Sequence, residues 1–179
     1  MPIRRSQLYH RAPLALLSAL VKEPSAVCYQ RELAQRAGVS PSSASRILAM
    51  FAREGLVRVE KKGNLRLYRP NRDHPLVRQF RVFEVILDLQ PLLQKLAPHA
   101  ERILLFGSAA QGLDDEESDI DLFVQSPEPE RVRGICAGAR VSGRDVRVVA
   151  MDRVEWAELR ERQPLFYDKI RHGVVLKDE

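Results

Sequence analysis

The apolar positions of the first fifty residues repeat with the period of an α-helix in three separate stretches. Residues 12–21 are almost all apolar, residues 30–37 place apolar side chains among charged ones, and residues 41–53 carry an apolar stripe beside several small hydroxyl side chains. Gly38 suits the residue after a helix, and Ser40 suits an N-cap. The pattern predicts three short helices joined by tight turns.

The periodicity changes to two after the third helix. Residues 56–60 and 65–69 alternate apolar with polar or basic side chains, and the intervening residues 61–64 have the composition of a turn. The segment therefore predicts a β-hairpin with a basic tip.

A long helical segment then runs towards Pro98 and carries two apolar stripes, which is more apolar surface than one small core needs. The first stripe consists of Leu76, Phe80, Phe83 and Leu87, and the second of Val82, Ile86, Leu89 and Leu93. Either a second copy of the chain covers one stripe, giving a homodimer, or the two neighbouring domains bury both stripes within one chain. Pro91 is expected to kink or divide this helix.

The second half of the chain mixes strand-like and helix-like segments. Strands are predicted at 101–106, 119–125, 144–151 and 174–176, and helices at 131–141, 152–163 and 165–171. Asp152 followed by Glu155 forms a capping-box pattern at the start of the second of these helices. The acidic run 114–117 is expected to be a solvated loop. The fold class is α+β, with a small α/β domain at the C-terminal end.

Charge is distributed unevenly. Residues 1–75 hold fourteen Lys and Arg against five Asp and Glu, whereas residues 76–179 hold fifteen against nineteen. A basic first half suits a nucleic-acid partner. No apolar run reaches the roughly 18 to 20 residues of a membrane span, and no signal-peptide pattern is present, so we expect a cytoplasmic protein without a membrane partner. Cys28 and Cys136 lack any metal-ligand or disulfide spacing and are expected to be buried thiols.

Three helices with a tight turn before the third, followed by a hairpin, resemble a winged helix-turn-helix domain. The resemblance covers roughly residues 7–71. It rests on Leu33, Ala34, Gly38, Val39, Ser40, Ile47, Leu48, Gly55, Leu56, Val57 and Tyr68. It implies that the third helix enters the major groove of double-stranded DNA and that the wing reaches the backbone or the minor groove.

The candidate DNA-binding residues follow from their chemistry. Small hydroxyls and an Arg near a helix N-terminus can contact phosphates and base edges, and cations on a wing add salt-dependent attraction. The helix candidates are Ser42, Ser43, Ser45 and Arg46, and the wing candidates are Lys61, Lys62, Arg66 and Arg69. The alternative is a helix-turn-helix that serves only as a protein interface.

A second motif lies in the acidic half. The apolar run 103–106 ends on Gly107 and Ser108, where a helix start can offer backbone N–H groups to an anion. Asp119 and Asp121 are two positions apart, so on a strand they share one face while Ile120 and Leu122 point to the other. Neighbouring carboxylates repel each other unless a cation lies between them, which suggests a Mg²⁺ site beside a phosphate site.

Together, Gly107-Ser108, Gly112 and Ser118-Asp119-Ile120-Asp121 resemble the minimal nucleotidyltransferase domain of the DNA polymerase beta superfamily, over about residues 97–176. The resemblance implies that Gly107, Ser108, Gly112 and Ser118 bind a nucleoside triphosphate and that Asp119 and Asp121 are catalytic and hold Mg²⁺ ions bridging its phosphates.

The third carboxylate of that family has two candidates here. Its usual position falls on Arg147, and Asp145 lies two residues earlier on the same face of the strand. Either Asp145 serves as the third catalytic carboxylate, or a guanidinium occupies the place of the second metal. Arg stays charged and cannot act as a base.

The sequence thus predicts a winged helix-turn-helix at 1–72, a linker helix at 73–98 and a nucleotidyltransferase-like domain at 99–179. The first hypothesis is a DNA-binding transcriptional regulator whose second domain binds nucleotide and Mg²⁺ or is catalytically silent. The second is an active Mg²⁺-dependent enzyme that transfers a nucleoside monophosphate to a hydroxyl of a protein, an RNA or a small molecule. The third is an antitoxin-type component with a toxin-like protein partner.

Overall fold

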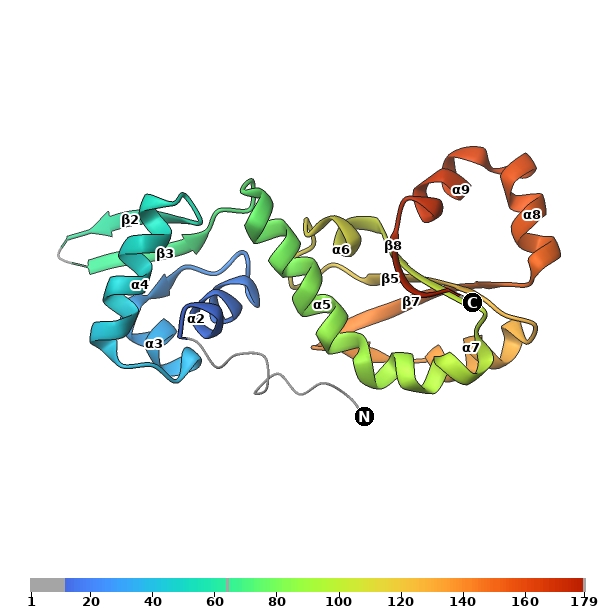
Figure 1. Cartoon of the computed structure of the whole chain (residues 1–179), viewed down its shortest axis with the longest axis horizontal. Coiled ribbons are helices and arrows are strands. Elements are labelled where there is room, and N and C mark those ends of the chain that lie inside the picture. The colour runs from blue at the N-terminus through green and yellow to red at the C-terminus, as the bar shows by residue number, and fades with distance from the viewer. Residues whose placement is uncertain (1–11, 64, 179) are drawn as a thin grey trace. The chain divides into compact units, whose positions relative to one another are not determined.

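A computed structural model describes residues 12–63 and 65–178 of the chain (Figure 1). The chain divides into two compact units, Met1–Leu87 and Asp88–Glu179, and each is described by itself. The boundary falls within the segment 73–98 that the sequence predicts as a linker helix. Residues 1–11 of the predicted first domain, Asn64 of the predicted turn and Glu179 lie outside the described residues.

The first unit contains the three predicted helices, α2 (Ala12–Val21), α3 (Gln30–Ala37) and α4 (Pro41–Arg53). Gly38 adopts a left-handed conformation with φ of 65° and ends α3. Ser40 caps α4, because its hydroxyl accepts the N–H of Ser43 at 3.2 Å. The helices meet around a core of fully buried apolar side chains, so their relative placement is fixed by packing.

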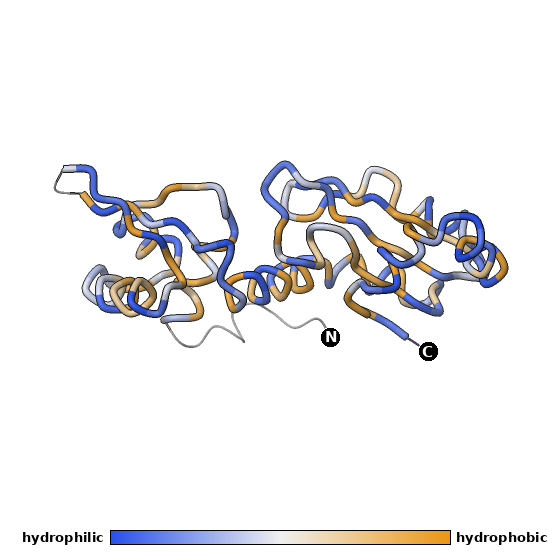
Figure 2. Tube along the Cα trace, turned by 90° about the horizontal axis from the view of Figure 1, so that it is seen from above, coloured by the Kyte–Doolittle hydropathy of each residue, from blue (hydrophilic) through white to orange (hydrophobic). Residues whose placement is uncertain are grey.

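A three-stranded antiparallel sheet completes this unit, with β1 (Cys28–Tyr29), β2 (Val57–Lys62) and β3 (Leu65–Pro70) in the order β1-β3-β2. Strands β2 and β3 form the predicted hairpin, with Val57 opposite Pro70 and Lys62 opposite Leu65. Strand β1 was not predicted, because two residues are too short to show a periodicity. Figure 2 shows the hydrophilic residues on the β2 side of the hairpin tip.

Helix α5 (Pro75–Leu96) is one continuous element with Pro91 inside it, so the proline does not divide it. The guanidinium of Arg81 is buried and donates to the carbonyls of Val21 and Lys22 at 2.9 and 3.3 Å, which satisfies the C-terminal end of α2. Val82 and Leu89 of the second stripe are buried, whereas Leu76 and Phe83 of the first are 64% and 37% exposed. In the described part of the chain, no helix combines the length and apolar character that crossing a bilayer requires.

The second unit is built on a five-stranded sheet in the order β6-β7-β5-β4-β8. Its strands are β4 (Arg102–Phe106), β5 (Ile120–Gln125), β6 (Arg140–Val141), β7 (Arg144–Met151) and β8 (Val174–Asp178). Strands β5 and β7 run parallel, and the other neighbours run antiparallel. The sheet thus brings the Gly-Ser turn after β4, the carboxylates of β5 and the side chains of β7 to one region.

The helical elements of this unit are η1 (Ala97–His99), α6 (Gly107–Gln111), α7 (Pro129–Cys136), α8 (Arg153–Arg162) and α9 (Pro164–Arg171). The helix predicted at 131–141 ends early, because residues 140–141 pair with β7 through a turn at Ser142 and Gly143, both with positive φ. The capping box at Asp152 and Glu155 is confirmed.

Helices α8 and α9 pack on the sheet through an aromatic cluster. The Trp156 ring lies 4.3 Å from the rings of both Phe123 and Tyr167, measured between centroids. Phe123 is two residues after Asp121 on β5, so the carboxylate faces the same side of the sheet as α8 and α9.

Candidate nucleic-acid interface and nucleotide site

The outer face of α4 begins with a cluster of hydroxyl groups. Ser42, Ser45 and Arg46 are exposed, and Ser43 is half-buried. The Ser40 hydroxyl lies 3.1 Å from that of Ser42 and 3.0 Å from that of Ser43, so these two candidates also support the helix cap. Ser45 and Arg46, one turn further along, offer donors on the exposed side. The N-terminal half of α4 can thus meet a polar partner.

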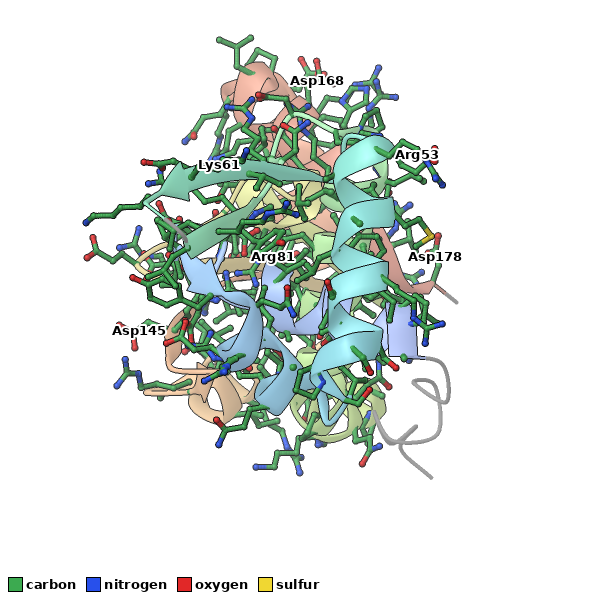
Figure 3. All side chains as sticks on the ribbon, turned by 90° about the vertical axis from the view of Figure 1, so that its left-hand side faces the viewer. Arg53, Lys61, Arg81, Asp145, Asp168 and Asp178 are labelled. Atoms are coloured by element: carbon green, nitrogen blue, oxygen red, sulfur yellow. The ribbon has the colours of Figure 1, made fainter. Side chains whose placement is uncertain are left out.

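The hairpin carries a concentration of positive charge. Lys61 lies directly opposite Arg66, and both side chains are exposed. Like charges at directly opposed positions destabilise a hairpin unless an external anion neutralises them. Within residues 12–63 and 65–178, no carboxylate lies at ion-pair distance from Lys61, Lys62 or Arg66. Figure 3 shows Lys61 on β2, with Arg53 near the end of α4.

Arg69, the fourth wing candidate, is partly neutralised. Its guanidinium lies 3.7 Å from the carboxylate of Glu60 on the opposite strand. One residue outside the predicted set, Arg31, adds positive charge beside the wing. It lines a groove of about 670 Å³ together with Arg66, Tyr29 and the acidic Glu32, among others. The sequence could not place Arg31 there, since the contact depends on how α3 packs against β3.

In the second unit, Asp121 packs directly on Gly107. Gly107 has φ of +75°, and a Cβ at this position would collide with a carboxylate oxygen of Asp121. Phe106 and Asp121 are cross-strand partners on β4 and β5, which fixes the contact. Glycine is therefore required twice here, for the left-handed backbone and for the close approach of the carboxylate.

Arg147 occupies the position across the sheet from these carboxylates. It lies directly opposite Asp121 in the β5–β7 pairing, and its guanidinium lies 2.7 Å from the carboxylate of Asp119. Asp119 is 25% exposed and Arg147 is 73% exposed. The cation on β7 thus faces the two aspartates that the motif predicts as metal ligands.

A second cation comes from α9. Burial raises the pKa of Asp121, while Lys169 and Arg147 oppose this shift and the charge of Asp119 adds to it. The ammonium of Lys169 also lies 5.6 Å from the centre of the Phe106 ring. Lys169 could not be predicted as a site residue from the sequence, because only the fold brings α9 to this turn. Two carboxylates and two cations therefore share the site.

Asp145 is engaged elsewhere. Its carboxylate forms an ion pair with Arg140 of β6 at 3.0 Å, and it is 69% exposed. Within the described residues, no three His, Cys, Asp or Glu side chains gather at metal-binding spacing. The catalytic role of Asp145 remains a prediction that this arrangement does not support.

The remaining motif residues shape the loop after α6. Gly112 has φ of +65° and ends α6, and the Ser108 carbonyl accepts the N–H of Leu113 at 3.0 Å. The Ser118 hydroxyl donates to Asp115 at 2.6 Å and accepts the N–H of that residue at 3.1 Å. Ser118 therefore closes the loop, and its role in nucleotide binding stays a prediction, as does that of Ser108.

The expectation of a solvated acidic loop is wrong for its first residue. Asp114 is fully buried and forms an ion pair with Arg144, which is itself buried at the start of β7. This pairing could not be predicted from the sequence, because the two residues are thirty positions apart. The ion pair ties the loop to β7 and so helps fix the position of Arg147, three residues further on.

The donor set suits two divalent cations poorly. Asp119 and Asp121 supply carboxylate oxygens of the kind that Mg²⁺ prefers. The family arrangement needs a third carboxylate on the next strand, and Arg147 occupies the position opposite Asp121. A single metal ion would have Asp119 and Asp121 as its carboxylate ligands, and binding it would break the ion pair between Asp119 and Arg147.

Comparison with known proteins agrees with the division of the chain into a helix-turn-helix unit and a second, sheet-containing unit. Residues 89–174 match the family model of the nucleotidyltransferase domain, and residues 14–61 match that of the IclR helix-turn-helix domain. Among curated proteins, none resembles the chain closely enough to count as a relative. The chain therefore carries a helix-turn-helix domain with a wing, followed by a nucleotidyltransferase domain, as its motifs predict.

Two solved structures resemble part of the chain. Sso10a-2, a DNA-binding protein from Sulfolobus solfataricus, shares 14% identity with a TM-score of 0.36, over 49% of this chain and 95% of its own. The MarR family transcriptional regulator SPO1453 from Silicibacter pomeroyi DSS-3 shares 21% identity with a TM-score of 0.39, over 52% of this chain and 67% of its own.

Proposed function

We propose that this chain is a transcriptional regulator that binds double-stranded DNA through α4 and the β2–β3 wing. The observation that carries the proposal is the pair of opposed cations, Lys61 and Arg66, beside Lys62 on the wing. An arrangement that weakens the isolated hairpin is understandable if phosphates neutralise it in the complex. The exposed donors of Ser45 and Arg46 would then contact base edges or phosphates in the major groove.

The salt dependence of DNA affinity tests this proposal. Removing one cation that neutralises a phosphate lowers the slope of log affinity against log salt by about 0.9, so Lys61→Ala with Lys62→Ala should lower it by about 1.8. Anisotropy of a labelled duplex with the full chain, at about 50 to 200 mM salt, measures the slope. Arg160→Ala with Arg162→Ala removes the same charge from exposed positions on α8 and should leave the slope unchanged. Negligible affinity at low salt, or equal slopes in both variants, would contradict the proposal.

We also propose that the regulator is a homodimer that pairs through the exposed stripe of α5. Leu76 and Phe83 are exposed, and the Phe83 ring lies 5.7 Å from that of Phe80, which is half-buried and packs against the core of the first unit, so the exposed apolar surface of the stripe is formed mainly by Leu76 and Phe83. A face on a single helix can pair with its own copy about a two-fold axis, and a dimer would read two DNA half-sites.

Light scattering of the eluting protein tests the dimer. Phe83→Asp should convert a dimer to a monomer, because it would place a charge in the apolar contact. Leu165→Asp is the matched control, since Leu165 is 87% exposed on α9 and lies outside the stripe. A wild-type monomer, or a dimer unaffected by Phe83→Asp, would refute pairing through this face.

The second unit is proposed to support regulation without transferring nucleotides. The supporting observation is Arg147, which stands opposite Asp121 where the resemblance asks for a carboxylate. The test incubates the chain with labelled ATP, CTP, GTP or UTP and Mg²⁺, alone and with cell extract. We expect no transfer. Label transfer that Asp119→Ala abolishes would establish the alternative, a nucleotidyltransferase that modifies a hydroxyl and holds Mg²⁺ at Asp119 and Asp121.

A further inference from the structure

Four charged side chains lie close to the turn after β4, and their positive and negative charges nearly cancel. Asp119 directly precedes β5, and Asp121 lies in that strand. Arg147 comes from β7, and Lys169 comes from α9. The contact between Arg147 and Asp119 is 2.7 Å, and both Arg147 and Lys169 act on Asp121. The repulsion between the aspartates, which would otherwise favour a divalent cation, is already relieved by groups of the chain itself.

We infer that Arg147 is the resident counter-ion of this site, and that it keeps divalent metal ions from binding to Asp119 and Asp121. This inference deepens the proposed non-transferring role of the second unit and rests on it. Arginine remains charged at every accessible pH, so it cannot be neutralised to admit a metal. Any divalent cation entering between the carboxylates must displace the guanidinium from Asp119 and then remain near its positive charge.

The position of Arg147 is built into the fold. The parallel pairing of β5 with β7 holds the residue opposite Asp121. Upstream on the same strand, the buried ion pair between Arg144 and Asp114 anchors β7 to the loop that leads into β5. Asp145, two residues before Arg147 on β7, forms an ion pair with Arg140 of β6 at the edge of the sheet. β7 therefore presents the cation of Arg147 to Asp119, while its own carboxylate, Asp145, is paired with Arg140.

Because Arg147 is 73% exposed, its side chain can be changed without disturbing the core, which makes the inference testable by substitution. The series runs from Arg147→Lys, which keeps the charge, through Arg147→Ala, which removes it, to Arg147→Asp, which supplies a third carboxylate opposite Asp121. Arg160→Asp is the control, since Arg160 is also exposed in the second unit, on α8, away from the two aspartates.

The experiment titrates each full-length variant with Mn²⁺ and measures free Mn²⁺ by electron paramagnetic resonance, with circular dichroism confirming the fold. We expect weak binding to the wild type, Arg147→Lys and Arg160→Asp, and binding tighter by at least about tenfold in Arg147→Asp, with Arg147→Ala between them. Adding Asp119→Ala to Arg147→Asp should abolish the gain.

Two results would overturn the inference. One is a wild-type chain that binds Mn²⁺ as tightly as Arg147→Asp, with binding lost in Asp119→Ala. The other is a folded Arg147→Asp variant that gains no affinity. These results can be distinguished from a failure of the proposed non-transferring role, because that role is tested by label transfer. A wild-type chain that binds Mn²⁺ tightly but transfers no label would overturn only the inference about Arg147.

Discussion

The contact between Gly107 and Asp121 gives the sharpest prediction about the candidate nucleotide site. Gly107→Ala would force a side chain into a backbone with φ of +75° and into the Asp121 carboxylate. The left-handed conformation costs about 1 to 2 kcal/mol for an alanine. Relieving the overlap costs about 1 to 3 kcal/mol more, by analogy with overpacked cores. The free energy of unfolding should therefore fall by about 2 to 5 kcal/mol.

Two further variants separate these contributions. Gly138→Ala has φ of +68° with nothing within 4 Å of the new methyl group, so it should cost only about 1 to 2 kcal/mol. In an Asp121→Ala background, the nearest remaining Asp121 atom to the new methyl is Cβ at 3.5 Å, an ordinary contact. Gly107→Ala in that background should cost about as much as Gly138→Ala, which gives a coupling energy of about 1 to 3 kcal/mol.

The assay follows denaturant unfolding of the full chain by tryptophan fluorescence. Trp156 is the one tryptophan of the sequence and packs against Phe123 and Tyr167, so its emission reports on the second unit. A Gly107→Ala cost equal to that of Gly138→Ala, or a cost that Asp121→Ala leaves unchanged, would show that the close approach of the Asp121 carboxylate does not require glycine at position 107.

Three further predictions concern other parts of the molecule. Asp114→Ala should lower the free energy of unfolding of the second unit by about 3 to 5 kcal/mol, because it removes the carboxylate that forms an ion pair with the buried Arg144, and adding Arg144→Met should recover part of the loss. The hydrogen bond from Arg153 lowers the pKa of Glu101. The Glu101 carboxylate therefore stabilises the fold above its ordinary pKa, and this stabilisation is lost as the pH falls through the lowered pKa. Arg153→Met should raise the pKa of Glu101 in an NMR titration, and an unchanged pKa would exclude Arg153 as the main cause of the shift. Ser40→Ala should cost the first unit about 1 kcal/mol in thermal unfolding followed by circular dichroism, because α4 loses its cap, and an unchanged stability would mean that the cap contributes nothing.

Local sequence signals predicted most of the fold. Helix periodicity, the Ser40 cap and the Gly38 terminus identified the helices of the first unit, and the alternation after Gly55 identified the hairpin. These signals act within a few residues of one another, so they can be read along the chain. The short strands β1 and β6 carry too few residues for a periodicity and are defined only by their partners.

The site was predicted only in part, because its electrostatics depend on residues far apart in the chain. The motif identified Gly107, Asp119 and Asp121, and the choice between Asp145 and Arg147 was open until the β5–β7 pairing placed Arg147 opposite Asp121. Lys169 reaches the site only because α9 folds back over β4. The burial of Asp114 likewise depends on Arg144, thirty residues away.

Protection of an engineered thiol shows whether α4 contacts DNA in the complex. Cys28 and Cys136 are both buried, so a cysteine introduced at the exposed position 45 becomes the reactive site for maleimide. Saturating duplex DNA at low salt should slow modification of Ser45→Cys by about tenfold or more, whereas Arg162→Cys, on α8, should react at its original rate. Equal rates for Ser45→Cys with and without bound DNA would mean that α4 does not contact DNA.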